Sequence, residues 1–225
     1  DCGGRYAARA ELEKIMKGRL ITFEGSEGSG KSTQIKLLTQ HLKSQHKNPL
    51  WLREPGGVRI SETIRRILLD VKNQKMNEIC ETLLYMAARS QLVSERILPA
   101  LRQGRVVLCD RFLDSTIVYQ GYGNGVDLDF IRKIGKYAAQ DIQPDITFIF
   151  DIEVQKGLFR KGQKKDRIEQ RSLEYHRRVR AGYLKLAGEE PQRIKLIQGS
   201  RSKEEIQQEI RRWVDRLLEI YSPSP

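Results

Sequence analysis

A glycine-rich segment near the start of the chain, Gly25-Ser-Glu-Gly-Ser-Gly-Lys31-Ser32, limits the possible folds more than any other feature. It matches the pattern G-x-x-x-x-G-K-[S/T] without a gap. Apolar residues at 19–23 indicate a strand before the segment, and the apolar spacing of residues 32–46 indicates a helix after it. A strand, this loop and a helix in that order predict a P-loop domain that binds a nucleoside triphosphate.

The residue types in the loop predict separate roles. Glycines let backbone N–H groups converge on phosphate oxygens, and the start of the helix adds positive potential. Lys31 is expected to reach the β and γ phosphates of ATP, and the Ser32 hydroxyl is expected to bind Mg²⁺. The predicted ATP-binding residues are Gly25, Ser26, Glu27, Gly28, Ser29, Gly30, Lys31, Ser32 and Thr33.

Glu27 is unexpected inside such a loop, because a carboxylate beside a triphosphate is repelled by it. We expect Glu27 to orient an acceptor substrate or a metal ion. The alternative is a side chain that points to solvent. The loop alone does not separate kinases from GTPases, ATPases or motor proteins.

Strands and helices alternate along the rest of the chain. Further strands are predicted at 50–52, 105–109, 146–150 and 193–197. Helices are predicted at 60–68, at 78–101 with Pro99 kinking or ending the helix, from Asp127 or Asp129 to about 139, at 153–161, at 169–187, and after a capping box at Ser202 to Glu205. Gly121 to Gly125 is predicted to be a flexible loop. This order predicts an α/β fold, a P-loop three-layer domain with a five-stranded parallel sheet flanked by helices.

Composition excludes several classes of protein. No stretch approaches 18 uncharged apolar residues, so we expect no membrane-spanning helix and no membrane partner. The three cysteines, Cys2, Cys80 and Cys109, are widely spaced and odd in number, which favours neither a disulfide framework nor a zinc site. A reduced, cytoplasmic setting fits this pattern best.

The chain has a net charge of +12, which favours acidic partners such as nucleic acid or nucleotide phosphates. Residues 156–180 hold ten Lys or Arg and three acidic residues, so this segment alone contributes +7. A solvated helix face is one explanation for the part after Arg171. The part before it needs another explanation.

Together with four later stretches, the loop resembles the bacterial thymidylate kinase family. The stretches are Leu52-Arg-Glu-Pro-Gly-Gly57, Leu84-Tyr-Met-Ala-Ala-Arg-Ser-Gln91, Asp110-Arg-Phe-Leu-Asp-Ser-Thr-Ile-Val-Tyr-Gln-Gly121 and Asp166-Arg-Ile-Glu169. They occur in the family's order and cover about residues 18–220. The resemblance implies transfer of the γ-phosphoryl of ATP to dTMP, giving dTDP and ADP for dTTP biosynthesis, with Mg²⁺ as cofactor. It also implies a homodimer whose interface includes the region near residues 85–100.

The resemblance implies that two arginines hold the dTMP phosphate. Arg53 and Arg111 each follow a predicted strand, where ligands bind at the edge of such a sheet. Asp110, which ends its strand, is placed near Mg²⁺ or its waters, as a second metal-site residue beside Ser32. The alternative for either arginine is a surface salt bridge.

By the same resemblance, the thymine base lies against the helix that carries Tyr85 and Arg89. Tyr85 is implied to stack on the base, where the family usually has Phe, and Arg89 to donate to a thymine carbonyl. Thr116 and Gln120 match positions that line the base pocket, and Tyr119 matches the residue that favours deoxyribose. The alternative for Tyr85 is core packing.

The resemblance also implies where the catalytic cations lie. Some family members carry an arginine in the P-loop where this chain has Gly28, so a short lid at about residues 160–169 is implied to supply them. Its candidates are Arg160, Lys161, Lys164, Lys165 and Arg167. The implied catalytic residues are Glu27, Lys31, Arg53, Arg111 and Arg160.

The expected domain limits are residues 16–225 for one P-loop kinase domain and residues 1–15 for a tag or disordered extension. The nearest alternative function is the same reaction on another nucleotide such as dUMP or dCMP. A basic, nucleic-acid-stimulated P-loop ATPase is a second alternative, which clustering of charge around a lid argues against. The third is a non-catalytic nucleotide-binding protein, which the presence of Lys31, Ser32 and Asp110 argues against.

Overall fold

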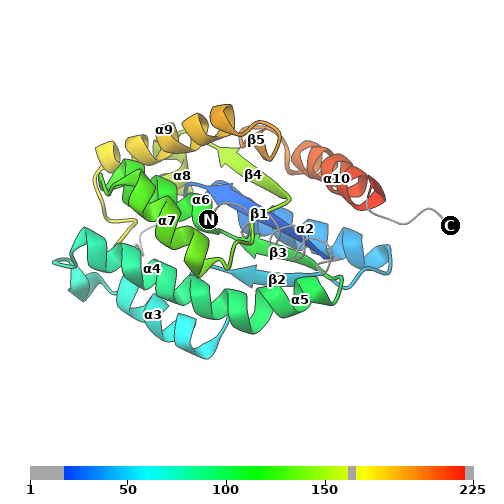
Figure 1. Cartoon of the computed structure of the whole chain (residues 1–225). Helices are drawn as coiled ribbons and strands as arrows, with labels where there is room; N and C mark the ends of the chain where they lie inside the picture. The colour runs from blue at the N-terminus through cyan, green and yellow to red at the C-terminus, as the bar shows by residue number, and fades with distance from the viewer. Residues whose placement is uncertain (1–17, 162–165, 221–225) are drawn as a thin grey trace.

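Five parallel strands form one sheet in the computed structural model, which describes residues 18–161 and 166–220 (Figure 1). The strands are β1 (Arg19–Gly25), β2 (Leu50–Arg53), β3 (Val106–Asp110), β4 (Ile146–Asp151) and β5 (Ile194–Gln198), in the spatial order β2-β3-β1-β4-β5. The predicted five-stranded parallel sheet is therefore confirmed. The expected extension at residues 1–15 lies outside the described residues.

Helices cover both faces of the sheet (Figure 1). One face packs against α2 (Lys31–Ser44) and α10 (Lys203–Ile220), through a core that includes Ile35 and Ile210. The elements on the other side are α3 (Arg59–Leu69), η1 (Val71–Asn73), α4 (Glu78–Leu92), η2 (Val93–Ile97), α5 (Leu98–Arg102), α6 (Leu113–Thr116), η3 (Ile117–Gly123), α7 (Leu128–Ala138) and α9 (Leu173–Glu189). The short helix α8 (Val154–Lys161) follows β4 and leads into the lid segment.

Alternating side chains of the central strand enter two different cores. Leu20 belongs to the cluster that contains Leu92, whereas Ile21 and Phe23 belong to the cluster that contains Ile35. All three β1 side chains are fully buried. A strand buried on both faces has a nearly continuous apolar sequence, the pattern that also indicated a buried parallel strand at 105–109.

Pro99 was predicted to kink or end the long helix, and the second of these outcomes is wrong. The chain stays helical from Glu78 to Arg102, passing through the π-helical turn η2 just before Pro99. Proline lacks the N–H of an α-helical hydrogen bond, and its ring collides with the carbonyl four residues earlier. A wider turn at Val93–Ile97 provides room for this ring, so the helix continues.

The prediction of a flexible loop at Gly121–Gly125 is also wrong. Gly121 and Gly123 belong to the π-helical element η3, and both are buried. A Cβ added at Gly123 would lie 2.6 Å from the Tyr175 ring, and Asn124 donates to the Glu81 carboxylate at 3.0 Å. Gly123 allows close packing against α9 and Gly121 allows close packing against α7, so these glycines do not mark a mobile segment.

Two predicted helix caps are confirmed and one helix start is corrected. Asp127 accepts from the Phe130 N–H at 2.7 Å, and Ser202 and Glu205 exchange the two hydrogen bonds of a capping box. Helix α9 begins at Leu173, after the cap Ser172, and not at residue 169. No helix within residues 18–161 and 166–220 has the length and apolar content needed to cross a membrane.

The carboxyl ends of the parallel strands meet at one edge of the sheet. Arg53 is paired in register with Asp110, and Asp110 with Phe23, so the ends of β2 and β3 lie beside the start of the P-loop. Ligands of open α/β sheets bind at this edge. The fold therefore gathers the predicted site residues at one place.

Candidate active site

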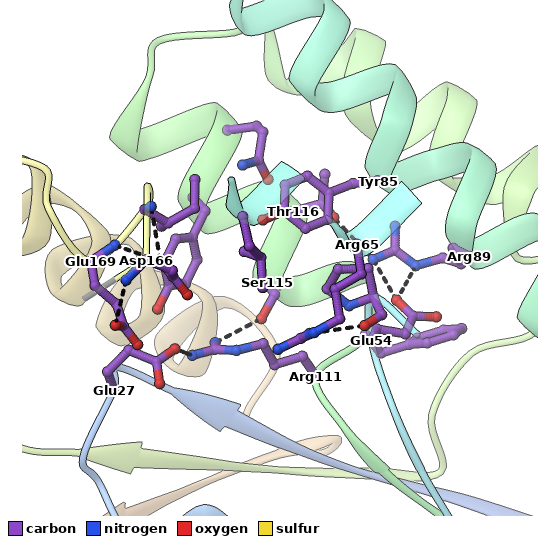
Figure 2. Close-up of a pocket in the computed structure, with 16 residues that line it drawn as sticks. Glu27, Glu54, Arg65, Tyr85, Arg89, Arg111, Ser115, Thr116, Asp166 and Glu169 are labelled. Carbon is purple, nitrogen blue, oxygen red and sulfur yellow. Dashed lines mark hydrogen bonds and ion pairs between the residues drawn. The ribbon is translucent and has the colours of Figure 1, made fainter. Parts of the chain in front are cut away.

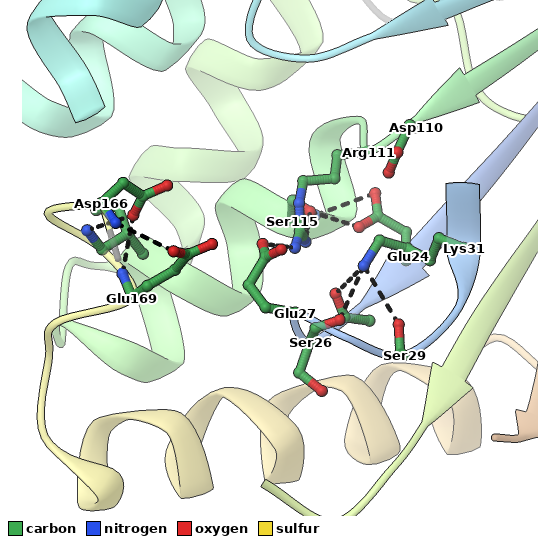
Figure 3. Close-up of polar contacts among 12 residues, drawn as sticks. Glu24, Ser26, Glu27, Ser29, Lys31, Asp110, Arg111, Ser115, Asp166 and Glu169 are labelled. Atoms are coloured by element: carbon green, nitrogen blue, oxygen red, sulfur yellow. Dashed lines mark hydrogen bonds and ion pairs between the residues drawn. The ribbon is translucent and has the colours of Figure 1, made fainter. Parts of the chain in front are cut away.

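Positive φ angles shape the P-loop between β1 and α2. Gly25, Gly28 and Gly30 have backbone φ angles of 126°, 69° and 95°, which residues other than glycine rarely adopt. Lys31 Nζ donates to the carbonyls of Gly25 at 3.0 Å and Ser26 at 2.8 Å (Figure 3). Burial lowers the pKa of Lys31 to about 8. The ammonium group therefore lies over a loop that already has a phosphate-binding shape.

A hollow opens above the loop, and we call it the P-loop hollow. Its lining comes from the loop and α2 and from the ends of β2 and β3, with one side chain from α3. The lining residues are Glu27, Gly28, Ser29, Gly30, Lys31, Ser32, Thr33, Arg53, Glu54, Arg65, Asp110 and Arg111. All the predicted ATP-binding residues line it except Gly25 and Ser26, whose carbonyls hold Lys31.

A second cavity, the aromatic pocket, lies next to the hollow (Figure 2). Its lining residues are Glu27, Glu54, Pro55, Arg65, Leu69, Tyr85, Arg89, Arg111, Phe112, Ser115, Thr116, Tyr119, Gln120, Asp166, Ile168 and Glu169. Six of the seven residues predicted to bind dTMP are among them, namely Tyr85, Arg89, Arg111, Thr116, Tyr119 and Gln120.

The two cavities share four lining residues, Glu27, Glu54, Arg65 and Arg111. Arg111 Nη2 donates to Glu27 Oε1 at 2.5 Å, so this carboxylate does not simply point to solvent. The Arg111 guanidinium also lies 5.0 Å from the centre of the Tyr119 ring. A cation and a carboxylate therefore stand where a group held in one cavity would face a group held in the other.

Arg89 is fixed deep in the aromatic pocket. It is 1% exposed, donates through Nε to Glu54 Oε2 at 2.8 Å, and donates through Nη2 to Thr116 Oγ1 at 2.9 Å. Its guanidinium also lies over the Phe112 ring at 5.3 Å. Burial raises the pKa of Glu54, whereas the charge of Arg89 lowers it. Contacts on several sides hold the guanidinium in one orientation, as recognition of a flat ligand requires.

Arg53 is the predicted dTMP-binding residue that does not line the aromatic pocket. Its half-exposed side chain lines the P-loop hollow and donates to the Glu62 carboxylate at 2.9 Å and 3.0 Å. The salt bridge considered as an alternative is therefore present for Arg53. Its position still places a positive charge beside Lys31 and Arg111.

Helix α8 lies directly against the P-loop. A Cβ added at Gly28 would lie 2.2 Å from the Gly157 carbonyl oxygen, and one added at Gly157 would lie 2.5 Å from the Glu27 carbonyl oxygen. No side chain fits at either position in this structure. The exposed Arg160 lies beside Gly28: the Cβ of Arg160 is 3.2 Å from the Cβ that would be added at Gly28.

Arg167 does not reach the P-loop hollow. It is 3% exposed, donates through Nε to the Leu68 carbonyl at 2.7 Å, and pairs with Glu81 at 2.6 Å. The prediction of Arg167 as a lid cation is therefore not supported. Its charge is already paired with Glu81 inside the protein, which indicates a structural role. Lys164, Lys165 and the side chain of Lys161 lie outside what the structure describes.

We expect Gly157→Ala to raise the KM for ATP about tenfold or more, because the methyl group would push α8 away from the Glu27 carbonyl and disturb the loop predicted to hold the phosphates. Steady-state kinetics at varied ATP would measure this. Gly188→Ala is the matched control, since a Cβ at Gly188 meets nothing within 4 Å. Equal ATP kinetics for both variants would contradict the assignment of close contact.

Several lining residues were not predicted from the sequence. Glu54 stood inside a quoted motif without being assigned a role, and so did Asp166 and Glu169. Arg65 had no motif, although it shares a face of α3 with Leu69 four residues later, and both line the pocket. Arg65 also donates to the Pro55 carbonyl at 2.9 Å. Only the packing of α3 beside the sheet edge shows that it belongs to the site.

Two oxygen donors at the hollow fit Mg²⁺. The Ser32 hydroxyl donates to Asp110 Oδ2 at 3.1 Å, and both residues line the P-loop hollow. Within the described residues there is no cluster of three or more His, Cys, Asp or Glu that could hold a metal ion. Mg²⁺ in phosphoryl-transfer enzymes is held by one or two protein oxygens together with phosphates and waters, which this pair matches.

Comparisons with known proteins agree with this geometry. A sequence model of the Thymidylate kinase family matches residues 23–210. A thymidylate kinase of Symbiobacterium thermophilum is 49% identical over 199 residues, covering 88% of this chain and 93% of that protein. One of Pelotomaculum thermopropionicum is 44% identical over 209 residues, covering 92% and 97%. The crystal structure of thymidylate kinase from Ehrlichia chaffeensis matches with a TM-score of 0.72 and 34% identity, over 88% of this chain and 98% of that one.

Proposed function

The chain belongs to the thymidylate kinase family and is an ATP-dependent nucleoside monophosphate kinase, and we propose that ATP binds in its P-loop hollow while dTMP binds in its aromatic pocket. The reaction transfers the γ-phosphoryl of ATP to dTMP and gives ADP and dTDP. One observation carries the assignment of the two cavities. They meet at Glu27, Glu54, Arg65 and Arg111, so the phosphates of two substrates would face each other there.

Phosphoryl transfer depends on positioning and on neutralising charge more than on covalent chemistry. Lys31 would neutralise the phosphates of ATP, and Arg111 would hold the acceptor phosphate of dTMP. Arg53 faces the hollow from the end of β2, and Arg160 lies beside Gly28 at the end of α8. Glu27, through its bond to Arg111, would set the position of the acceptor phosphate.

The aromatic pocket supplies groups suited to a pyrimidine deoxynucleotide. Tyr85 would stack on the base, and Arg89 would donate to a thymine carbonyl from its fixed orientation. Thr116 and Gln120 would line the base site, and Tyr119 would crowd the 2′ position of the sugar. Tyr85 is partly buried and lines the cavity, which favours stacking on a base over core packing.

Ser32 and Asp110 would hold Mg²⁺ or its bound waters. Bound there, the ion would neutralise phosphate charge and orient the β and γ phosphates. The Ser32 hydroxyl already donates a hydrogen bond to Asp110 Oδ2, so the two oxygen atoms that would coordinate the ion lie next to each other. Ser32, Asp110 and Lys31 line the same hollow, so an ion held by Ser32 and Asp110 would lie near the Lys31 ammonium group.

Turnover on a panel of nucleotides tests the proposal. We expect coupled ADP-release assays to show dTMP preferred over dUMP, dCMP and dGMP. Equal rates on dCMP and dTMP would overturn the assignment of the base pocket. DNA should leave the rate unchanged, because we propose no nucleic-acid partner; ATP hydrolysis stimulated by DNA would favour the alternative of a nucleic-acid-dependent ATPase.

We also propose that residues 16–225 form one kinase domain, with a lid at about residues 160–169, and that the enzyme works in the cytoplasm. Cys80 and Cys109 are both free thiols, which fits a reducing compartment. Burial raises the pKa of the Cys109 thiol well above its usual value, so this residue is inert core.

We propose that the enzyme is a homodimer, and an apolar surface on α3 and α4 supports this. These two helices pack side by side along one side of the molecule (Figure 1). Ile60 and Ile67 on α3 and Ile79 and Leu83 on α4 are each more than 40% exposed. Large exposed apolar side chains gathered on neighbouring helices are typical of an interface.

We expect Leu83→Lys to convert the dimer to a monomer at micromolar concentration, because it places a charge in the apolar interface. Sedimentation velocity would measure the change. Leu184→Lys on α9 is the control, since Leu184 is similarly exposed and lies on another helix. A wild-type protein that sediments as a monomer would contradict the dimer itself.

A further inference from the structure

Glu24, the residue just before the P-loop, has no role in the reaction as described so far. It is fully buried at the end of β1, although its side chain is ionisable. Glu24 Oε1 accepts from the N–H groups of Phe112 at 2.7 Å and Ser115 at 3.3 Å. Glu24 Oε2 accepts from the hydroxyls of Ser115 at 2.5 Å and Tyr183 at 2.9 Å. Four donors from two distant parts of the chain therefore converge on this carboxylate.

The same two hydroxyls contact Arg111. Arg111 Nη1 donates to Ser115 Oγ at 3.1 Å and to the Tyr183 hydroxyl at 3.2 Å (Figure 3 shows the Glu24, Ser115 and Arg111 side of this cluster). A hydroxyl has one proton and two lone pairs. When Ser115 and Tyr183 give their protons to Glu24, their lone pairs are left to face the guanidinium. The Ser115 and Tyr183 hydroxyls also lie 2.9 Å from each other, so both act as acceptors toward Arg111 when the ionised Glu24 takes both of their hydrogen bonds. Burial and the charge of Asp114 raise the pKa of Glu24 to about 7, so this arrangement is complete above that pH.

We propose that Glu24 is a positioning residue for the acceptor phosphate, which acts through the Ser115 and Tyr183 hydroxyls to fix the guanidinium of Arg111. The proposal rests on the proposed role of Arg111 in holding the phosphate of dTMP. Glu24 itself touches no substrate. It sets which way the arginine fork points before the substrate arrives, so no reorganisation is needed when the phosphate binds.

The backbone around Arg111 is held by the same group. Arg111 has a φ angle of 72°, an unfavourable conformation for a residue with a Cβ. Its N–H donates to the Phe23 carbonyl, and the next N–H, that of Phe112, donates to Glu24. Glu24 therefore secures both the turn that carries Arg111 and the far end of its side chain.

Tyr183 extends this arrangement to a third element. It lies on α9, the helix that follows the lid segment, whereas Ser115 lies on α6 and Glu24 on β1. The Tyr183 side chain is 2% exposed, so its hydroxyl meets Arg111 and Glu24 without competition from bulk water. Burial raises the pKa of the Tyr183 hydroxyl well above its usual value, which keeps the donated proton in place.

Tyr183→Phe is the first test, because it removes one acceptor from Arg111 and one donor from Glu24 while keeping the buried ring. The readout is the dissociation constant for dTMP and for thymidine, which lacks the phosphate, by isothermal titration calorimetry. We expect dTMP binding to weaken about tenfold, as for loss of one hydrogen bond to a charged group. Thymidine binding and the KM for ATP should stay within about twofold.

Glu24→Gln is the second variant. Its amide would offer N–H donors where the carboxylate accepts, so the hydroxyls would turn toward it and away from Arg111. We expect the same selective loss for dTMP, larger than in Tyr183→Phe. Tyr122→Phe is the matched control, because the Tyr122 hydroxyl is buried yet has no hydrogen-bond partner among the described residues.

Equal weakening of dTMP and thymidine, or no weakening of either, would overturn the proposal. If Glu24→Gln does not fold, the Tyr183→Phe result alone decides. Wild-type turnover separates this inference from the proposed function. A wild type that binds dTMP better than thymidine but does not phosphorylate it would refute the function, while loss of that preference in Tyr183→Phe would still support the role of Glu24. A wild type without that preference refutes the inference.

Discussion

Arg111→Ala is expected to lower kcat/KM for dTMP by about 10³-fold, the scale measured for cations that stabilise phosphoryl transfer. Arg111 lines both cavities and pairs with Glu27, so its loss removes charge at the point where the two phosphates would meet. It also leaves the Glu27 carboxylate without this partner beside the ATP phosphates. Both changes weaken the stabilisation of the phosphoryl group during its transfer. The fall in kcat/KM should therefore exceed the fall caused by loss of any single contact to the base.

Steady-state kinetics with dTMP and ATP varied in turn would measure this loss. Arg111→Lys should keep part of the activity, about ten- to a hundredfold above Arg111→Ala, because an ammonium keeps the charge but lacks the bidentate fork. Arg66→Ala, an exposed arginine on α3, is the control and should change kcat/KM less than twofold. If Arg111→Ala retained more than a tenth of wild-type kcat/KM, the junction of the two cavities would not be the place of transfer.

Arg89→Met is expected to destabilise the protein by about 3–5 kcal/mol, the cost of leaving one partner of a buried ion pair alone. Its pair with Glu54 has side-chain exposures of 2% and 5%, so water cannot solvate the remaining carboxylate. For a domain of this size the melting temperature should fall by about 10 °C. The preference for dTMP over dCMP should also fall, because the fixed donor to the base is gone, whereas ATP binding should change little.

The pH dependence gives a second readout of the same variant. Burial raises the pKa of Glu54, and Arg89 lowers it, so removing Arg89 raises it further. The folded variant then binds a proton more readily than the unfolded chain, and its stability increases as pH falls through the folded pKa. The loss of melting temperature relative to wild type should therefore be smaller at pH 5 than at pH 8.

A double variant separates stability from recognition. Glu54→Leu combined with Arg89→Met removes both charges, so most of the lost stability should return. The preference for dTMP should not return, because no donor faces the base. Thermal melts and the nucleotide panel measure the two properties. Restored preference in the double variant would show that Arg89 acts only through packing.

The sequence alone determined the features that depend on neighbours along the chain. The P-loop needs positive φ angles at closely spaced glycines, which only a short motif can supply. Apolar runs of strand length predicted β1 to β5, and those of β1, β3 and β4 are nearly continuous because these strands are buried on both faces. Arg53 and Asp110 could be placed at one edge because each ends a parallel strand, and all such ends lie together.

Side chains that enter the site from helices were accessible from the sequence only through a resemblance. Tyr85 and Arg89 were assigned in that way, whereas Arg65 was missed because no local pattern distinguishes it from the exposed Arg66 beside it. Arg167 shows the opposite error. Its sequence position suggested a free lid cation, but Glu81, far away in the chain, already pairs with it.

Only the tertiary structure decided which residues contact the proposed site residues from behind. Glu24 is one polar residue in an apolar strand until β1, α6 and α9 come together and bring two hydroxyls between it and Arg111. Nothing local distinguishes Gly157 from other glycines until α8 lies against the P-loop. Local periodicity reports which face of an element is buried, but it carries no information on which distant element will cover that face. The positioning of Arg111 depends on such a meeting, and so only the folded chain reveals it.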